Sequence, residues 1–147
     1  VDVLLGGRAA EEVFIGEIST GAGNDLERAT DIIKSMAGIY GMSDIAGLMV
    51  LEKQRNVFLN GGTTKDYSDK MAEKLDDHIK NTLQERYEIV KVRLEEYRGC
   101  IEMIVATLAE HETIDGEILR GLIETFETEA GIESKLKSSL KKEDGQA

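Results

Sequence analysis

The 147 residues include no proline, no tryptophan, one cysteine and two histidines, and these shortages exclude several kinds of structure and site. Without proline, no residue interrupts a long helix from within. The single cysteine, Cys100, cannot form an internal disulfide, which favours a reducing compartment. On an apolar helix stripe, such a cysteine is interpreted as a small core residue rather than as a nucleophile.

Positive charge and long apolar runs are also scarce. The 18 lysines and arginines stand against 29 aspartates and glutamates, which gives a net charge of −11. A chain this acidic repels phosphate backbones, so nucleic acid is not expected as a partner. No apolar run approaches the roughly 18 residues that would span a membrane, and no signal peptide is visible. Residues 1–8 contain neither an initiator methionine nor a helix cap, so further chain is expected upstream.

Apolar residues at spacings of three and four are abundant, and this period is typical of helices that bury one face. They predict helices over residues 1–13, 24–40, 68–97, 101–110 and 118–126. The two longest apolar stripes consist of Leu26, Ala29, Ile33, Met36 and Tyr40, and of Met71, Leu75, Ile79, Leu83, Tyr87, Val90, Leu94 and Tyr97. Residues 48–51 suit a short strand or an extended segment. The predicted fold class is mainly α, in one domain with at most one such strand.

Several residues predict where these helices begin, end or break. Asn24 followed by Glu27 is typical of a capping box, and Ser68 and either Thr113 or Asp115 are candidate caps for later helices. Gly41 is expected to end the helix that Asn24 opens. The pair Gly6 and Gly7 costs a helix about 1 kcal/mol per residue relative to alanine, which indicates a close backbone approach or a local break. Residues 54–65 are predicted to be a flexible loop, and residues 131–147 a polar, frayed tail.

Few residues could carry chemistry. His78 and His111 lie 33 residues apart, and neither has a histidine four residues away with which to share a helix face. Each is interpreted as a structural or solvated histidine, and no nucleophile elbow is present. The segment from Gly21 to Leu26 begins like a phosphate-binding glycine loop but lacks its last glycine, which disfavours a nucleotide site. From the sequence alone, Asp25 is an acidic residue that interacts well with a helix dipole.

Three segments, LLGGRAAEE (residues 4–12), STGAGNDLERAT (residues 19–30) and YGMS (residues 40–43), resemble the FtsH family of membrane-anchored AAA+ zinc proteases. They occur in the order of that family and at compatible spacing. The resemblance continues more weakly through ERY (residues 85–87) and ETID (residues 112–115), and thus covers roughly residues 1–125.

The resemblance implies a zinc site that is only partly present. In the family, a HExxH helix supplies two histidine ligands and a glutamate general base, and a later aspartate supplies the third ligand. By motif position that aspartate is Asp25, and Asn24 would orient the turn that carries it. Two imidazoles and a carboxylate leave one position on zinc open for an activated water. Because HExxH is absent, no catalytic residue is expected in this chain, which should be inactive alone. Arg8 could pair with Glu12 one turn on.

The resemblance also implies the organisation of the whole protein. Residues 1–130 would be the C-terminal part of the peptidase domain. Missing segments would include membrane anchors and an AAA+ module that uses ATP and magnesium. The intact protein would be a homo-hexamer in the bacterial inner membrane, with its peptidase domain on the cytoplasmic side, acting on protein substrates. The alternative from another functional class is a non-catalytic helical interaction module.

Overall fold

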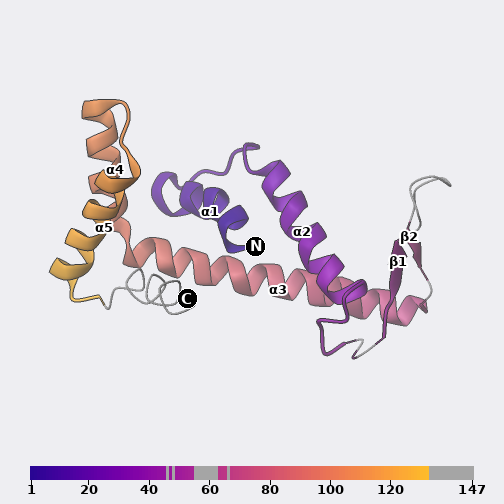
Figure 1. Ribbon diagram of the computed structural model, residues 1–147. Helices are drawn as coiled ribbons and strands as arrows, with labels where there is room; N and C mark the ends of the chain where they lie inside the picture. Colours follow the sequence, from indigo (N-terminus) through magenta and orange to yellow (C-terminus); the bar gives the residue numbers. More distant parts are fainter. Residues whose placement is uncertain (46, 48, 55–62, 66, 133–147) are drawn as a thin grey trace. The chain divides into compact units, whose positions relative to one another are not determined.

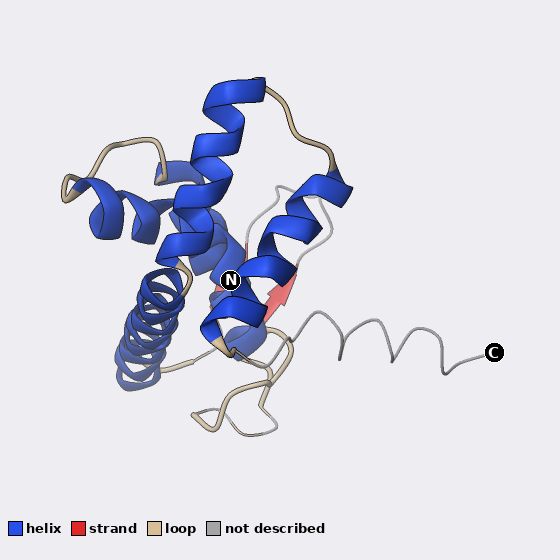
Figure 2. Cartoon of the chain, turned by 90° about the vertical axis from the view of Figure 1, so that its left-hand side faces the viewer, coloured by secondary structure: helices blue, strands red, loops and turns tan. Residues whose placement is uncertain are grey.

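The computed structural model describes residues 1–45, 47, 49–54, 63–65 and 67–132. They divide into two compact units, one within residues 1–95 and the other from residue 96 onward. Helices dominate both units, and this confirms the mainly α class (Figure 2). No helix within the described ranges is both long and apolar enough to cross a membrane.

The first unit contains three α-helices, a π-helical turn and a small hairpin (Figure 1). Helix α1 (Asp2–Ala10) continues directly into the π turn η1 (Glu11–Ile15), and α2 (Gly23–Gly38) follows after a loop. The hairpin pairs β1 (Glu52–Gln54) with β2 (Thr63–Lys65) in antiparallel register. The long helix α3 (Asp69–Glu96) completes the unit. The hairpin thus has two short strands, where the sequence suggested at most one.

The core of the first unit lies between α2, the segment that follows it, and α3. Its buried members are Ile33, Ala37, Leu51, Leu75 and Ile79. Val1, Tyr67, Met71 and Leu83 pack against this cluster. The stripe predicted for α3 is therefore confirmed in its first half. The stripe predicted for α2 is only partly right, because Met36 and Tyr40 remain 40% and 63% exposed while Ala37 is buried.

The glycine pair in α1 neither breaks the helix nor admits a close neighbour, contrary to the sequence-based expectation. Helix α1 runs through both residues, and a Cβ at Gly6 or Gly7 would meet no described atom within 4 Å. Gly41 has a left-handed φ of 61°, but α2 already ends at Gly38. Of residues 48–51, Leu48 lies outside the described residues, and the first strand begins only at Glu52. The predicted loop over residues 54–65 contributes to both strands at its ends, and residues 55–62 lie outside the described residues.

The second unit contains α4 (Arg98–His111) and α5 (Gly116–Ala130), which pack against each other. Tyr97 lies with its ring 5.8 Å from that of Phe126, and its hydroxyl donates a hydrogen bond of 2.9 Å to the buried carboxylate of Glu127. Cys100 is buried, as predicted for a small core residue. The predicted tail lies outside the described residues from residue 133 onward.

Candidate functional site

Asp25 is the third residue of α2 and lies, partly exposed, in its first turn. The turn before it is closed by backbone hydrogen bonds from Gly23 N to Thr20 O (3.1 Å) and from Leu26 N to Ala22 O (3.0 Å). Among the described residues, no hydrogen bond or ion pair engages the Asp25 side chain. Its carboxylate therefore lies in the first turn of α2, at the positive end of the helix dipole, where negative charge is stabilised.

Asn24 was predicted to cap α2, and this prediction is wrong. Helix α2 begins at Gly23, one residue earlier, and its cap position is taken by Ala22, which has no capping side chain. The loop before the helix turns tightly enough for the backbone of Thr20 to accept from Gly23, so the helix starts without an asparagine cap. Asn24 is thus an exposed residue inside the first turn, directly beside Asp25.

Glu11 fastens the loop that leads to Asp25. Its Oε2 accepts a hydrogen bond of 3.1 Å from the backbone N–H of Ser19, and its Oε1 accepts one from the Ser19 hydroxyl. The Ser19 Oγ in turn accepts from the Gly21 N–H at 3.1 Å. Because of the hydrogen bonds from Ser19, the pKa of the Glu11 carboxyl lies below its ordinary value. The loop is therefore held by a carboxylate that stays ionised at neutral pH.

Arg8 reaches the same loop rather than the partner proposed for it. Its Nη1 donates a hydrogen bond of 3.3 Å to the carbonyl oxygen of Ser19. The predicted Arg8–Glu12 pair does not form in the part of the chain that is described. Glu12 instead turns toward α3, and Arg8 affects it only through its charge.

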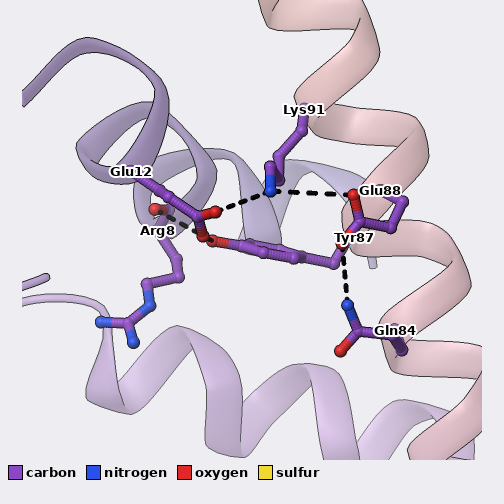
Figure 3. A network of polar contacts seen from close by, with 6 residues as sticks. All are labelled: Arg8, Glu12, Gln84, Tyr87, Glu88 and Lys91. Atoms are coloured by element: carbon purple, nitrogen blue, oxygen red, sulfur yellow. Dashed lines mark hydrogen bonds and ion pairs between the residues drawn. The ribbon is translucent and has the colours of Figure 1, made fainter. Parts of the chain in front are cut away.

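Glu12 is bound by two residues of α3 that are one helical turn apart (Figure 3). The Tyr87 hydroxyl donates to its Oε2 at 2.6 Å, and the Lys91 ammonium donates to its Oε1 at 2.6 Å. The hydrogen bonds from Lys91 and Tyr87 lower the pKa of the Glu12 carboxyl, and the same contact with Glu12 raises the pKa of Lys91. Burial, followed by the hydrogen bond to Glu12, raises the pKa of Tyr87.

A second ion pair joins the start of α1 to α3. Arg86 Nε donates to Asp2 Oδ1 at 2.8 Å, and Arg86 Nη2 donates to Asp2 Oδ2, so the pair is bidentate. The hydrogen bonds from Arg86 lower the pKa of Asp2. Bidentate arginine–carboxylate pairs fix orientation as well as distance. Helix α1 is thus tied to α3 near both of its ends.

A cleft of about 670 Å³ opens between α1, α2 and α3. Its lining combines apolar residues with charged ones: Leu5, Arg8, Glu12, Leu26, Thr30, Lys34, Asp76, Ile79, Lys80, Leu83, Gln84 and Tyr87. Leu26, the residue after Asp25, contributes to this lining. The cleft lining thus includes the sequence neighbour of the candidate metal ligand.

The two histidines belong to different units. His78 is half-buried on α3 in the first unit, and His111 is exposed at the end of α4 in the second. Within the described ranges, no three His, Cys, Asp or Glu residues are grouped so that they could hold a metal ion. Burial, with a smaller contribution from the charge of Glu127, raises the pKa of the Cys100 thiol and so disfavours the reactive thiolate.

Sequence reasoning did not find the contacts of Glu11 with Ser19 or of Glu12 with Tyr87 and Lys91. Glu12 is separated from Tyr87 and Lys91 by 75 and 79 residues. The only local signal was the position of Tyr87 and Lys91, which face the same side of one helix because they are four residues apart.

Comparison with known proteins shows what the chain is similar to. Residues 1–122 match the model of peptidase family M41. A protein named ATP-dependent zinc metalloprotease FtsH from Helicobacter pylori (strain J99) is 58% identical over 138 residues, which are 92% of this chain and 22% of that protein.

Proteins of the same name are also similar in more distant bacteria. The one from Sulfurovum sp. is 54% identical over 92% of this chain and 20% of its own length, and the one from Thermotoga maritima is 42% identical over 84% and 21%. The chain thus spans about a fifth of the length of these relatives. The resemblance read from the three sequence segments is confirmed, and the chain belongs to peptidase family M41.

Proposed function

We propose that residues 1–130 are the C-terminal part of a zinc peptidase domain, in which Asp25 is the third protein ligand of the catalytic metal. The observation that carries this proposal is the contrast between the Asp25 side chain and the loop before it. The side chain has no hydrogen-bond or ion-pair partner among the described residues, while Glu11 and Arg8 fasten the loop at Ser19. Such an arrangement fits a carboxylate that is held in place for a ligand outside this chain.

The donor set fits zinc but is incomplete. Catalytic zinc takes three protein ligands, and two histidines with one carboxylate are a well-established combination. This chain offers the carboxylate of Asp25, and its sequence contains no HExxH motif. We therefore place both histidine ligands and the general-base glutamate in a segment upstream of Val1. When bound, zinc acidifies a water molecule and polarises the carbonyl of the peptide bond.

The chain's own residues then have distinct roles. Asp25 supplies one ligand. Because Asn24 does not cap α2, the part proposed for its side chain is to orient the adjacent Asp25 carboxylate when the metal is bound. The 147-residue chain alone is expected to hold no catalytic zinc and to cleave no peptide bonds, because a single carboxylate binds zinc weakly.

The activity proposed for the intact protein is ATP-dependent degradation of protein substrates, as in the name of the relatives. In this proposal, an AAA+ module outside this chain binds ATP and magnesium, and upstream segments anchor the protein in the bacterial inner membrane with its peptidase domain on the cytoplasmic side. Six copies form the protease, and α3, α4 and α5 contribute to the walls of its chamber.

The first experiment measures bound zinc per chain in the natural protein extended upstream of Val1. Asp25→Ala is compared with Asp31→Ala, an exposed aspartate of the same helix. We expect about one zinc in the parent and in Asp31→Ala, with a marked loss in Asp25→Ala. Casein cleavage should follow the same order.

Two other outcomes would change the conclusion. Equal zinc in both variants would mean that another residue is the third ligand. The absence of zinc from the extended parent would instead favour a non-catalytic helical interaction module.

A further inference from the structure

Two adjacent glutamates open the π turn η1 and bind different parts of the first unit. Glu11 binds Ser19 in the loop before α2, whereas Glu12 binds Tyr87 and Lys91 on α3. Neighbouring residues of a helical turn point in different directions, so adjacent side chains can reach different elements. π turns are rare and occur often at functional sites.

The two hydrogen bonds that Glu12 accepts are strong for a carboxylate that is partly exposed. Both of its carboxylate oxygens are engaged, one by the Tyr87 hydroxyl and one by the Lys91 ammonium, each at 2.6 Å. The side chains of Lys91 and Glu12 are 26% and 37% exposed, so water screens their attraction only in part. Charge-assisted hydrogen bonds of this length are roughly twice as strong as neutral ones.

Lys91 and Tyr87 are themselves held on α3 (Figure 3). Lys91 also approaches Glu88 at 3.7 Å, and Glu88 accepts a hydrogen bond of 2.8 Å from Gln84. The Lys91 ammonium lies 5.6 Å from the centre of the Tyr87 ring, within the range of a cation–π contact. Glu12 therefore contacts two side chains, Tyr87 and Lys91, whose positions on the surface of α3 are fixed by their own contacts.

We infer that Glu12, with Tyr87 and Lys91, is a positioning unit for the metal ligand Asp25. The inference rests on the proposed role of Asp25. The contacts form a continuous path: α3 holds Glu12, the adjacent Glu11 holds Ser19, and the Ser19 hydroxyl accepts from Gly21, two residues before α2 begins. Asp25 follows Gly21 by four residues.

Through this path, the contacts of Glu12 with α3 affect metal binding, although Glu12 is not a metal ligand in this proposal. If Glu12 loses its partners, η1 can shift on α3, and the loop that Glu11 holds shifts with it. Partners that orient a metal ligand commonly change metal affinity 10- to 100-fold when they are removed. None of these three residues touches the reacting atoms in this proposal, so they position the ligand and do not take part in the chemistry.

The test uses the natural protein extended upstream of Val1, with zinc affinity measured by competition with a chelator. Glu12→Gln and Lys91→Met should each weaken zinc binding about 10-fold or more. Lys91→Arg, which keeps a cation within reach of Glu12, should restore most of it. Glu85→Gln and Lys74→Met make the same charge changes at exposed positions of α3 outside the cleft lining and should leave zinc affinity unchanged.

A merely structural role is distinguished by measuring kcat, KM and melting temperature on the same variants. Positioning predicts a lower kcat at an unchanged KM for a peptide substrate, together with weaker zinc binding. Lower melting temperatures with parental zinc affinity would overturn the inference. Should Glu12→Gln fail to fold, Tyr87→Phe removes only one hydroxyl, and we still expect zinc binding several-fold weaker than in the parent.

The two proposals fail in different ways. If Asp25→Ala loses zinc while Glu12→Gln, Lys91→Met and Tyr87→Phe bind it as the parent does, only the positioning role is overturned. If Asp25→Ala keeps its zinc, the proposed function fails and the positioning of Asp25 fails with it.

Discussion

At the scale of single residues, Asp115 determines where α5 begins. Its Oδ1 accepts hydrogen bonds from the N–H groups of Glu117 and Ile118 at 3.0 and 2.8 Å. These two amides have no partner within the helix, so the side chain replaces the water that would otherwise bind them. The sequence left Thr113 and Asp115 as alternative caps, and the structure selects Asp115.

Asp115→Ala should therefore lower the free energy of unfolding by about 1 kcal/mol, the usual cost of losing such a cap. Thr113→Ala is the matched control, because the Thr113 side chain accepts from neither helix amide. Urea denaturation followed by circular dichroism measures both variants. Equal losses in the two would contradict the assignment of the cap.

The residues that sequence analysis predicted correctly act over short distances. Ser68 lies at the start of α3, where its Oγ accepts from Met71 N at 3.4 Å, as predicted, and Asp115 caps α5. Such caps bind amides two or three residues away, so a local pattern suffices to identify them. The prediction for Asn24 failed because a backbone hydrogen bond from Gly23 to Thr20 closes the preceding turn, and α2 begins one residue before Asn24.

At the scale of elements, the close approach of α4 and α5 depends on Gly99. A Cβ built at Gly99 would lie 2.9 Å from Cε2 of Phe126, so any side chain there requires the ring to move. Gly121, in the interior of α5, has no described atom within 4 Å of the same position. The two glycines are thus in helices but differ in their surroundings.

The same substitution should consequently have different effects at the two glycines. Gly121→Ala should stabilise the protein by up to about 1 kcal/mol, because alanine favours the helix. Gly99→Ala should instead destabilise the protein by about 1 kcal/mol or more, because the added methyl group overpacks against Phe126. Thermal unfolding of both variants measures the difference. A comparable gain at both positions would show that the ring of Phe126 moves at little cost.

Elements were predictable where one face of a helix is regularly apolar, and less so where partners are remote. The buried face of α3 followed from the spacing of Leu75, Ile79 and their neighbours. The exposure of Met36 on α2 could not be predicted from spacing, because burial depends on which neighbour packs against the helix. The contact of Glu12 with Lys91 joins residues 79 positions apart, and no periodic pattern in one sequence encodes it. The role of Asp25 came from family resemblance and stays a prediction.

At the scale of the whole molecule, the two compact units should respond separately to damage in one core. Leu75 is 2% exposed and belongs to the core of the first unit. Leu75→Ala should cost about 2–5 kcal/mol through lost burial and the cavity left behind. Hydrogen exchange is expected to show lost protection in α2 and α3, with protection of α4 and α5 unchanged.

The control for this experiment is Leu119→Ala, which removes the same atoms at a position that is 36% exposed in the second unit. It should change protection of α2 and α3 little. Simultaneous loss of protection in all helices after Leu75→Ala would mean that the units unfold as one.

The bidentate pair of Asp2 with Arg86 also bears on the order of events during synthesis. Its partners are 84 residues apart, and Leu5 and Ala9 on α1 are buried in the folded protein. At a translation rate of roughly 5–20 residues per second, Asp2 leaves the ribosome about 4–17 seconds before Arg86. Throughout that interval the first helix emerges without the long helix that fixes it. The nascent segment must therefore be kept from aggregation by means other than its final contacts.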